Sequence, residues 1–149
     1  MKVYHLFWFV TFLNIVIGLT GINNESGTVD MPIANMYYVI SYFNLSMLIA
    51  LWYFLTGLGY WIVLIIYKKR LVNPMTFFHT FVLIGCFVLY WLVVVYKILF
   101  MENVSIYDKY EIFNETFFGL IVLMIVIAQP VYIINLLIGL FSKKLVNEK

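Results

Sequence analysis

Residues 116–142 read TFFGLIVLMIVIAQPVYIINLLIGLFS, a stretch with no charged side chain between Glu115 and Lys143. An α-helix rises about 1.5 Å per residue, so roughly 20 apolar residues cross the hydrocarbon core of a bilayer, and this stretch is long enough. It lacks the alternation of polar and apolar residues that a membrane β-barrel strand needs. We therefore expect a transmembrane helix over residues 116–141.

Three further uncharged stretches lie earlier in the chain: Val3 up to Glu25, Met31 to Tyr67 and Leu71 to Tyr96. Of the 149 residues, 65% are hydrophobic and 11% charged, and the mean hydropathy is +1.02. A soluble domain of this size cannot bury so much apolar surface. The sequence predicts an all-α, integral membrane four-helix bundle in a single transmembrane domain, with spans over residues 3–21, 35–67, 75–99 and 116–141.

The first apolar stretch has two interpretations, because Lys2 followed by apolar residues is also the pattern of a secretory signal peptide. Trp8 and Asn14 interrupt the stretch, and residues 18–21 make a poor cleavage site. We expect a retained helix.

Prolines and glycines predict where the other helices begin or bend. A straight helix over residues 35–67 would be about 50 Å long, so we expect it to tilt, to project, or to break near Gly57 and Gly59. Pro74 is expected to begin the third span, with Asn73 as a cap. Pro130 falls inside the fourth span, where we expect it to kink the helix and free a carbonyl about four residues earlier.

The charges of the loops predict which ends share a side of the membrane. Lys68, Lys69 and Arg70 separate spans two and three, and Lys143, Lys144 and Lys149 follow span four. The other two loops are mainly acidic. Because cationic segments resist translocation, we expect the basic loop, the N-terminus and the C-terminus to lie inside.

Side chains able to carry chemistry are few within the expected spans. Cys86 is the one cysteine, so it has no internal disulfide partner, and we interpret it as a small buried apolar side chain. His79 is either a functional group or, the interpretation we favour, a neutral imidazole bonded to a neighbouring helix. No carboxylate lies in the hydrocarbon part of a span, which argues against proton-coupled transport, and no residues have metal-ligand spacing.

Neutral polar side chains remain inside the spans, and we expect them to bond across helices with roughly 0.6–2 kcal/mol each. The candidates for a docking face or a transport pathway are Asn14, His79, Gln129 and Asn135. Four Asn-x-Ser/Thr sequences begin at Asn24, Asn44, Asn103 and Asn114, three of them in expected outer loops.

A resemblance to a known family covers nearly the whole chain. Span one ends in IGLTG (residues 17–21), a loop with Asp30 follows, and then comes YYVISYFN (residues 37–44). This order is similar to the ninth and tenth helices of subunit I of the haem–copper (cytochrome c) oxidases, where a Gly-Leu-Thr-Gly helix end leads to Tyr-Tyr-Val-Val-Ala-His-Phe-His. Three later stretches resemble the rest of that family's tenth to twelfth helices: GLGYW (57–61), YDKYEIFN (107–114) and QPVYIIN (129–135). Span three, with His79, is loosely similar to the eleventh helix.

The departures from the family pattern concern its cofactor ligands. Tyr42 and Asn44 stand at the two positions that match the family's axial haem histidines, and neither replaces a neutral imidazole in a bis-histidine haem. Ala34 and Asn35 stand where the family has a His-Asp pair that helps to hold a magnesium ion. We therefore expect no cofactor and no metal in this chain, no catalysis by this chain alone, and no catalytic residue.

Two functional hypotheses follow. The resemblance implies a non-catalytic, oxidase subunit I-like structural or accessory component of a respiratory complex, in a bacterial or mitochondrial inner membrane. The alternative is a small four-helix transporter or channel that works as an oligomer, with Gln129 and Pro130 marking a pathway. The expected partners are the lipid bilayer and either other membrane subunits or further copies of the chain, and no nucleic acid.

Overall fold

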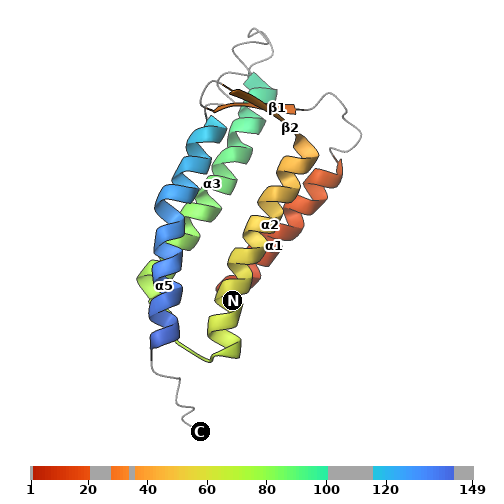
Figure 1. Cartoon of the computed structure of the whole chain (residues 1–149). Helices are drawn as coiled ribbons and strands as arrows, with labels where there is room; N and C mark the ends of the chain where they lie inside the picture. The colour runs from red at the N-terminus through yellow and green to blue at the C-terminus, as the bar shows by residue number, and fades with distance from the viewer. Residues whose placement is uncertain (1, 21–27, 34–35, 101–115, 143–149) are drawn as a thin grey trace. The chain divides into compact units, whose positions relative to one another are not determined.

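The computed structural model describes residues 2–20, 28–33, 36–100 and 116–142 (Figure 1). It is mostly helical, and four helices are long and apolar enough to cross a membrane: Val3–Thr20, Phe43–Ile66, Asn73–Val93 and Thr116–Phe141. These helices correspond to the four predicted spans, apart from the start of the second, and are compatible with an integral, multi-pass membrane protein. The side of the membrane on which each terminus lies stays a prediction.

The chain forms two compact units. The first comprises Met1–Leu71 and Ile138–Lys149, and the second comprises Val72–Leu137. Whether the helices assemble into the expected single transmembrane domain also stays a prediction.

The first unit is a helical hairpin with a small sheet at its turn. It contains α1 (Val3–Thr20), β1 (Thr28–Ile33), β2 (Met36–Ser41), α2 (Tyr42–Trp61) and the π-helical segment η1 (Ile62–Ile66). Helices α1 and α2 run antiparallel and side by side (Figure 1). The Phe7 ring lies 5.6 Å from the Tyr60 ring and 6.1 Å from the Tyr53 ring, and all three side chains are buried. Aromatic burial therefore holds the middle of this hairpin together.

The prediction that a helix begins near residue 35 is wrong. Residues 36–41 form strand β2, which pairs antiparallel with β1 in the register Thr28↔Ser41 to Ile33↔Met36. Helix α2 starts at Tyr42 because Ser41 has an extended backbone and its Oγ accepts a hydrogen bond from the Asn44 N–H at 3.3 Å, an N-cap arrangement. The aromatic and β-branched stretch MYYVIS fits a strand as well as a span. Among the described residues, this two-stranded sheet departs from the predicted all-α fold and the remaining elements are helices.

Of the three alternatives for the long second span, the break near Gly57 and Gly59 does not occur. Helix α2 continues through both glycines to Trp61, and the widened turn comes later, at η1. A Cβ on Gly57 would lie 2.7 Å from Trp8 Cδ1, so this glycine serves the close approach of α1 and α2.

The second unit is a hairpin of two long helices. Helix α3 (Asn73–Phe100) begins one residue before the predicted start at Pro74, so the missing N–H of this proline falls in the first turn. Asn73, expected as the cap, is the first residue of the helix. The returning helix is α-helical from residue 116, widens into the π-helical segment η2 (Leu123–Ala128), and continues as α5 (Gln129–Phe141). Its last turn, from Ile138 onward, belongs to the first unit.

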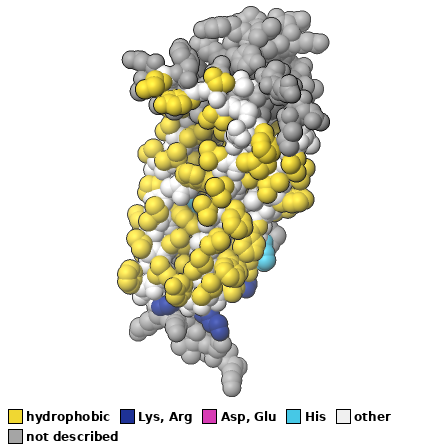
Figure 2. Space-filling view, turned by 45° about the vertical axis from the view of Figure 1, so that its right-hand side comes forward, with side chains coloured by type: hydrophobic (Ala, Val, Ile, Leu, Met, Phe, Trp, Pro, Cys, Tyr) yellow, Lys and Arg dark blue, Asp and Glu magenta, His cyan; other side chains and the backbone are white. Residues whose placement is uncertain are grey.

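Large apolar side chains cover the outer faces of the helices. Each of the four spans exposes several, among them Phe12, Leu51, Phe81 and Val126. Figure 2 shows apolar side chains over the helices on the visible face. Exposed apolar side chains on every span suit a lipid environment.

Candidate functional site

The best-defined polar cluster lies between the start of α3 and the middle of α5, within the second unit. Asn135 is fully buried. Its Nδ2 donates to Thr76 Oγ1 at 2.7 Å, and its Oδ1 accepts from the Val72 N–H at 2.9 Å. The Thr76 hydroxyl in turn donates to the Val72 carbonyl at 3.1 Å. The cluster thus satisfies a backbone donor that the start of α3 leaves without a helical acceptor.

His79 lies one turn further along α3 and is fully buried. Its ring stacks on the Tyr132 ring of α5, with centroids 4.9 Å apart and an interplanar angle of 23°. The sequence singles out His79 but not Tyr132, although Tyr132 and Asn135 are spaced by three residues and so share one face of α5. The structure therefore brings together two of the predicted residues, His79 and Asn135, in a single polar seam.

Gln129 and Thr80 extend this seam toward η2. The atoms Thr80 Oγ1 and Gln129 Nε2 are buried, and neither has a hydrogen-bond partner among the described residues. His79 and Tyr132 are stacked on each other and so mark the facing sides of α3 and α5. Thr80 follows His79 by one residue, which places its side chain about 100° further around the axis of α3. Gln129 precedes Tyr132 by three residues, which places its side chain about 60° away around the axis of α5. In antiparallel helices these rotations lead to the same side, so Thr80 and Gln129 lie on one lateral face of the hairpin at neighbouring levels.

The backbone beside Gln129 departs from α-helical bonding. Pro130 has no N–H and cannot serve the carbonyl four residues earlier. The π-helical turn of η2 ends two residues before Pro130, and the Gln129 N–H donates to the Met124 carbonyl five residues earlier. The sequence predicts the disturbance at Pro130, and the structure gives its form as a widened turn.

Asn14 forms its hydrogen bonds inside the first unit. The side chain is buried and its Nδ2 donates to the Val10 carbonyl at 3.0 Å, while its own backbone carbonyl accepts from Ser46 Oγ at 2.6 Å. The contact between α1 and α2 therefore runs through the backbone of Asn14, and Gly18, one turn on, lets Ser46 and Met47 come close. Sequence reasoning finds the residue but not this partner.

The two positions that match haem ligands lie at the start of α2. Asn44 is exposed in the first turn, while Tyr42 begins the helix and its side chain lies outside the described part. Ser46, the third residue of the Asn44 sequon, is buried and bonded to α1. Asn24, Asn103 and Asn114 fall outside the described residues. Among the residues that the structure describes, no three His, Cys, Asp or Glu side chains are grouped as metal ligands.

Comparisons with protein-family models, with curated proteins and with solved structures find no match to this chain. The site is therefore interpreted from its own geometry.

Proposed function

We propose that the chain is a non-catalytic membrane subunit that resembles oxidase subunit I and serves as a structural or accessory component of a respiratory membrane complex. Both termini lie on the inner side of a bacterial or mitochondrial inner membrane in this proposal. In this proposal its helices pack against membrane helices of the complex.

The observation that carries the proposal is the use of the polar side chains within the spans. Ser46 of α2 donates to the Asn14 carbonyl of α1, and Asn135 of α5 donates to Thr76 of α3. The side chains of Asn14 and Thr76 donate to carbonyls one turn earlier in their own segments. In a bilayer, lipid offers no alternative partner, so the two bonds from Ser46 and Asn135 help to hold helices together, as a structural subunit requires.

Two glycines supply places where another helix can approach. A Cβ built on Gly85 or on Gly119 meets nothing within 4 Å, whereas Gly18, Gly57 and Gly139 each have a neighbour at 2.9 Å or less. Glycine in a helix costs about 1 kcal/mol relative to alanine. The three packed glycines are explained within the first unit, and an external helix would explain Gly85 and Gly119.

The test is co-purification with a defined complex. Tagged chain, expressed in its source membrane and extracted in mild detergent, is expected to elute with haem-containing oxidase subunits at a fixed ratio. Gly85→Leu with Gly119→Leu should reduce that ratio at least tenfold, while Leu92→Phe, at an exposed apolar position of α3, should leave it unchanged. Elution of the unaltered chain without oxidase subunits would refute the proposal.

A transporter or channel is the second candidate, favoured by the buried Thr80 Oγ1 and Gln129 Nε2 beside the π-helical segment η2. Interrupted helices with unsatisfied polar groups are typical of substrate sites in membrane proteins. Purified chain in liposomes should then pass small solutes, and Gln129→Leu should abolish the flux. Flux equal to that of empty liposomes would exclude this candidate.

A further inference from the structure

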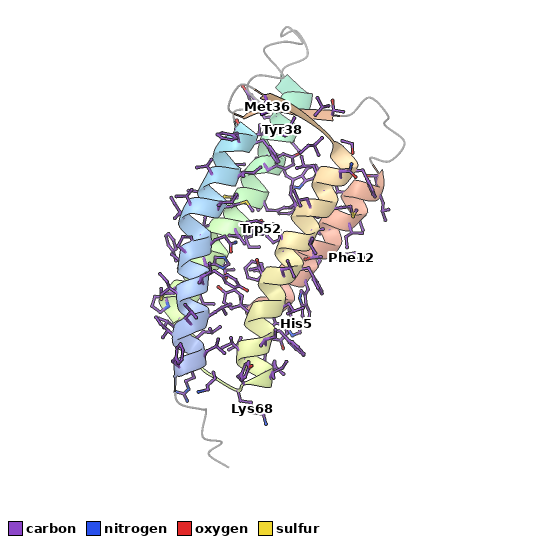
Figure 3. All side chains as sticks on the ribbon, in the orientation of Figure 1. His5, Phe12, Met36, Tyr38, Trp52 and Lys68 are labelled. Carbon is purple, nitrogen blue, oxygen red and sulfur yellow. The ribbon has the colours of Figure 1, made fainter. Side chains whose placement is uncertain are left out.

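Three consecutive cations, Lys68, Lys69 and Arg70, follow the end of η1 in the first unit. Figure 2 shows Lys and Arg side chains near one end of the visible face, and Figure 3 places Lys68 at the end of the first unit opposite to Met36 and Tyr38. These residues directly follow a membrane-spanning candidate helix, which ends at Ile66. They therefore place cations where this helix would leave the hydrocarbon core.

Lys69 already has a role in the fold. Its Nζ donates to the Ser142 carbonyl beyond the end of α5, and its N–H donates to the Val63 carbonyl at 3.0 Å. The Ser142 hydroxyl also reaches the Arg70 carbonyl at 3.4 Å. A cation beside the last carbonyls of a helix is favourable, so the charge of Lys69 is employed internally.

Lys68 and Arg70 differ from Lys69 in their exposure. Both side chains are exposed, while that of Lys69 is half-buried. Lys68 and Arg70 therefore present two cations to the surroundings of the chain.

The backbone conformation of Lys68 is one that does not favour a lysine. Its φ of 50° is in the left-handed region, and it is the only non-glycine residue with positive φ among those described. It follows the helix end at Tyr67, at the position where glycine or asparagine normally permits this conformation, and the Lys69 N–H closes the turn on Val63. A lysine at a glycine position implies that the charge itself has a use.

We propose that Lys68 and Arg70 bind the phosphate of an anionic phospholipid at the headgroup level. The guanidinium of Arg70 can bind two phosphate oxygens and the ammonium of Lys68 supplies a second charge. Ile66 and Tyr67, directly before Lys68, are 55% and 49% exposed, so they can contact the acyl chain and the glycerol region of the same lipid. This site does not rest on the proposed function.

The test compares lipid binding by the full chain and its variants. The chain is reconstituted in nanodiscs of phosphatidylcholine with one fifth phosphatidylglycerol, and retained lipids are counted by native mass spectrometry. Because each juxtamembrane cation contributes about fivefold to binding of anionic lipid, Lys68→Gln with Arg70→Gln should lower the preference for phosphatidylglycerol roughly 25-fold. An unchanged preference in this double variant would overturn the proposal.

Lys69→Gln is the matched control, because it removes an adjacent charge that is bound to Ser142. It should keep the lipid preference within about twofold while lowering the thermal midpoint of the chain. An equal loss of preference in this variant would reduce the site to nonspecific attraction by net charge and would overturn it. Millimolar inorganic phosphate should not displace the lipid, and displacement would instead identify a site for free phosphate.

Lys68→Gly separates the turn from the charge. Glycine relieves the left-handed backbone, so this variant should unfold at a higher temperature than the unaltered chain while its preference for phosphatidylglycerol falls about fivefold. A stabilised variant with full lipid preference would remove Lys68 from the site.

Discussion

Asn135 of α5 donates from Nδ2 to Thr76 Oγ1 of α3 at 2.7 Å, a hydrogen bond between the side chains of two helices in the second unit. The opposite end of the same amide accepts the Val72 N–H. One buried amide thus joins the two helices and completes the start of α3. A bond of this kind in a membrane protein contributes roughly 0.6–2 kcal/mol.

Replacing Asn135 with leucine, which has nearly the same volume, is expected to destabilise the chain by about 1–3 kcal/mol. The change removes both bonds and leaves the half-buried Val72 N–H without its acceptor. The measurement is the free energy of unfolding in mixed micelles. Asn44→Leu, at an exposed position, should change it by less than about 0.5 kcal/mol.

Gln129→Leu should instead raise the free energy of unfolding. Its buried Nε2 has no hydrogen-bond partner among the described residues, so replacement by an apolar side chain of similar size removes a desolvation cost of about 1–3 kcal/mol. The same unfolding measurement should show stabilisation. Destabilisation similar to that of Asn135→Leu would show that the Gln129 amide is bonded in the membrane.

The glycines provide a matched comparison of helix packing. Gly57→Ala puts a Cβ 2.7 Å from Trp8 Cδ1 and 2.8 Å from Trp8 Nε1, and overpacking of this kind costs about 1–3 kcal/mol. Gly85→Ala meets open space and should gain up to about 1 kcal/mol from helix propensity. Circular dichroism during thermal unfolding should therefore give a lower midpoint for the first variant and a higher one for the second. Equal midpoints would contradict the close packing of α1 against α2.

The sequence predicts the helices because long stretches of it contain no charged residue. A hydrocarbon core requires uncharged side chains along the whole span, so these stretches are long enough to recognise. Strand β2 is missed because MYYVIS is uncharged and continuous with the span that follows, and only pairing with β1 distinguishes it. The start of α3 is predicted to within one residue since Pro74 acts locally.

The polar seam is predicted only by residue type. The sequence predicts Asn135 and His79 as candidate residues because polar groups are energetically costly inside a span. Their partners Thr76 and Tyr132 depend on the register of two antiparallel helices, which the sequence leaves open. The same holds for Lys69 and Ser142, which are distant in sequence and meet only through the return of α5. Tertiary register, and not local preference, decides these contacts.

Replacing Pro130 tests whether this single residue determines the form of the helix around it. Pro130→Ala restores an N–H, so the carbonyl four residues earlier regains a donor and ordinary α-helical bonding becomes available. We expect η2 to convert to α-helix, which lengthens the rise along Leu123–Ala128 by a fraction of a turn and rotates Gln129 relative to the residues before η2.

Solid-state nuclear magnetic resonance can follow this change through the carbonyl and Cα shifts of Met124 and its neighbours. Pro74→Ala is the control, because Pro74 lies in the first turn of α3, where its N–H is not needed, and the shifts of α3 should stay the same. If η2 is formed by Pro130, only the first variant alters the bond from the Gln129 N–H to the Met124 carbonyl. A π-helical turn that persists in Pro130→Ala would show that packing against α3, and not the proline, widens the helix.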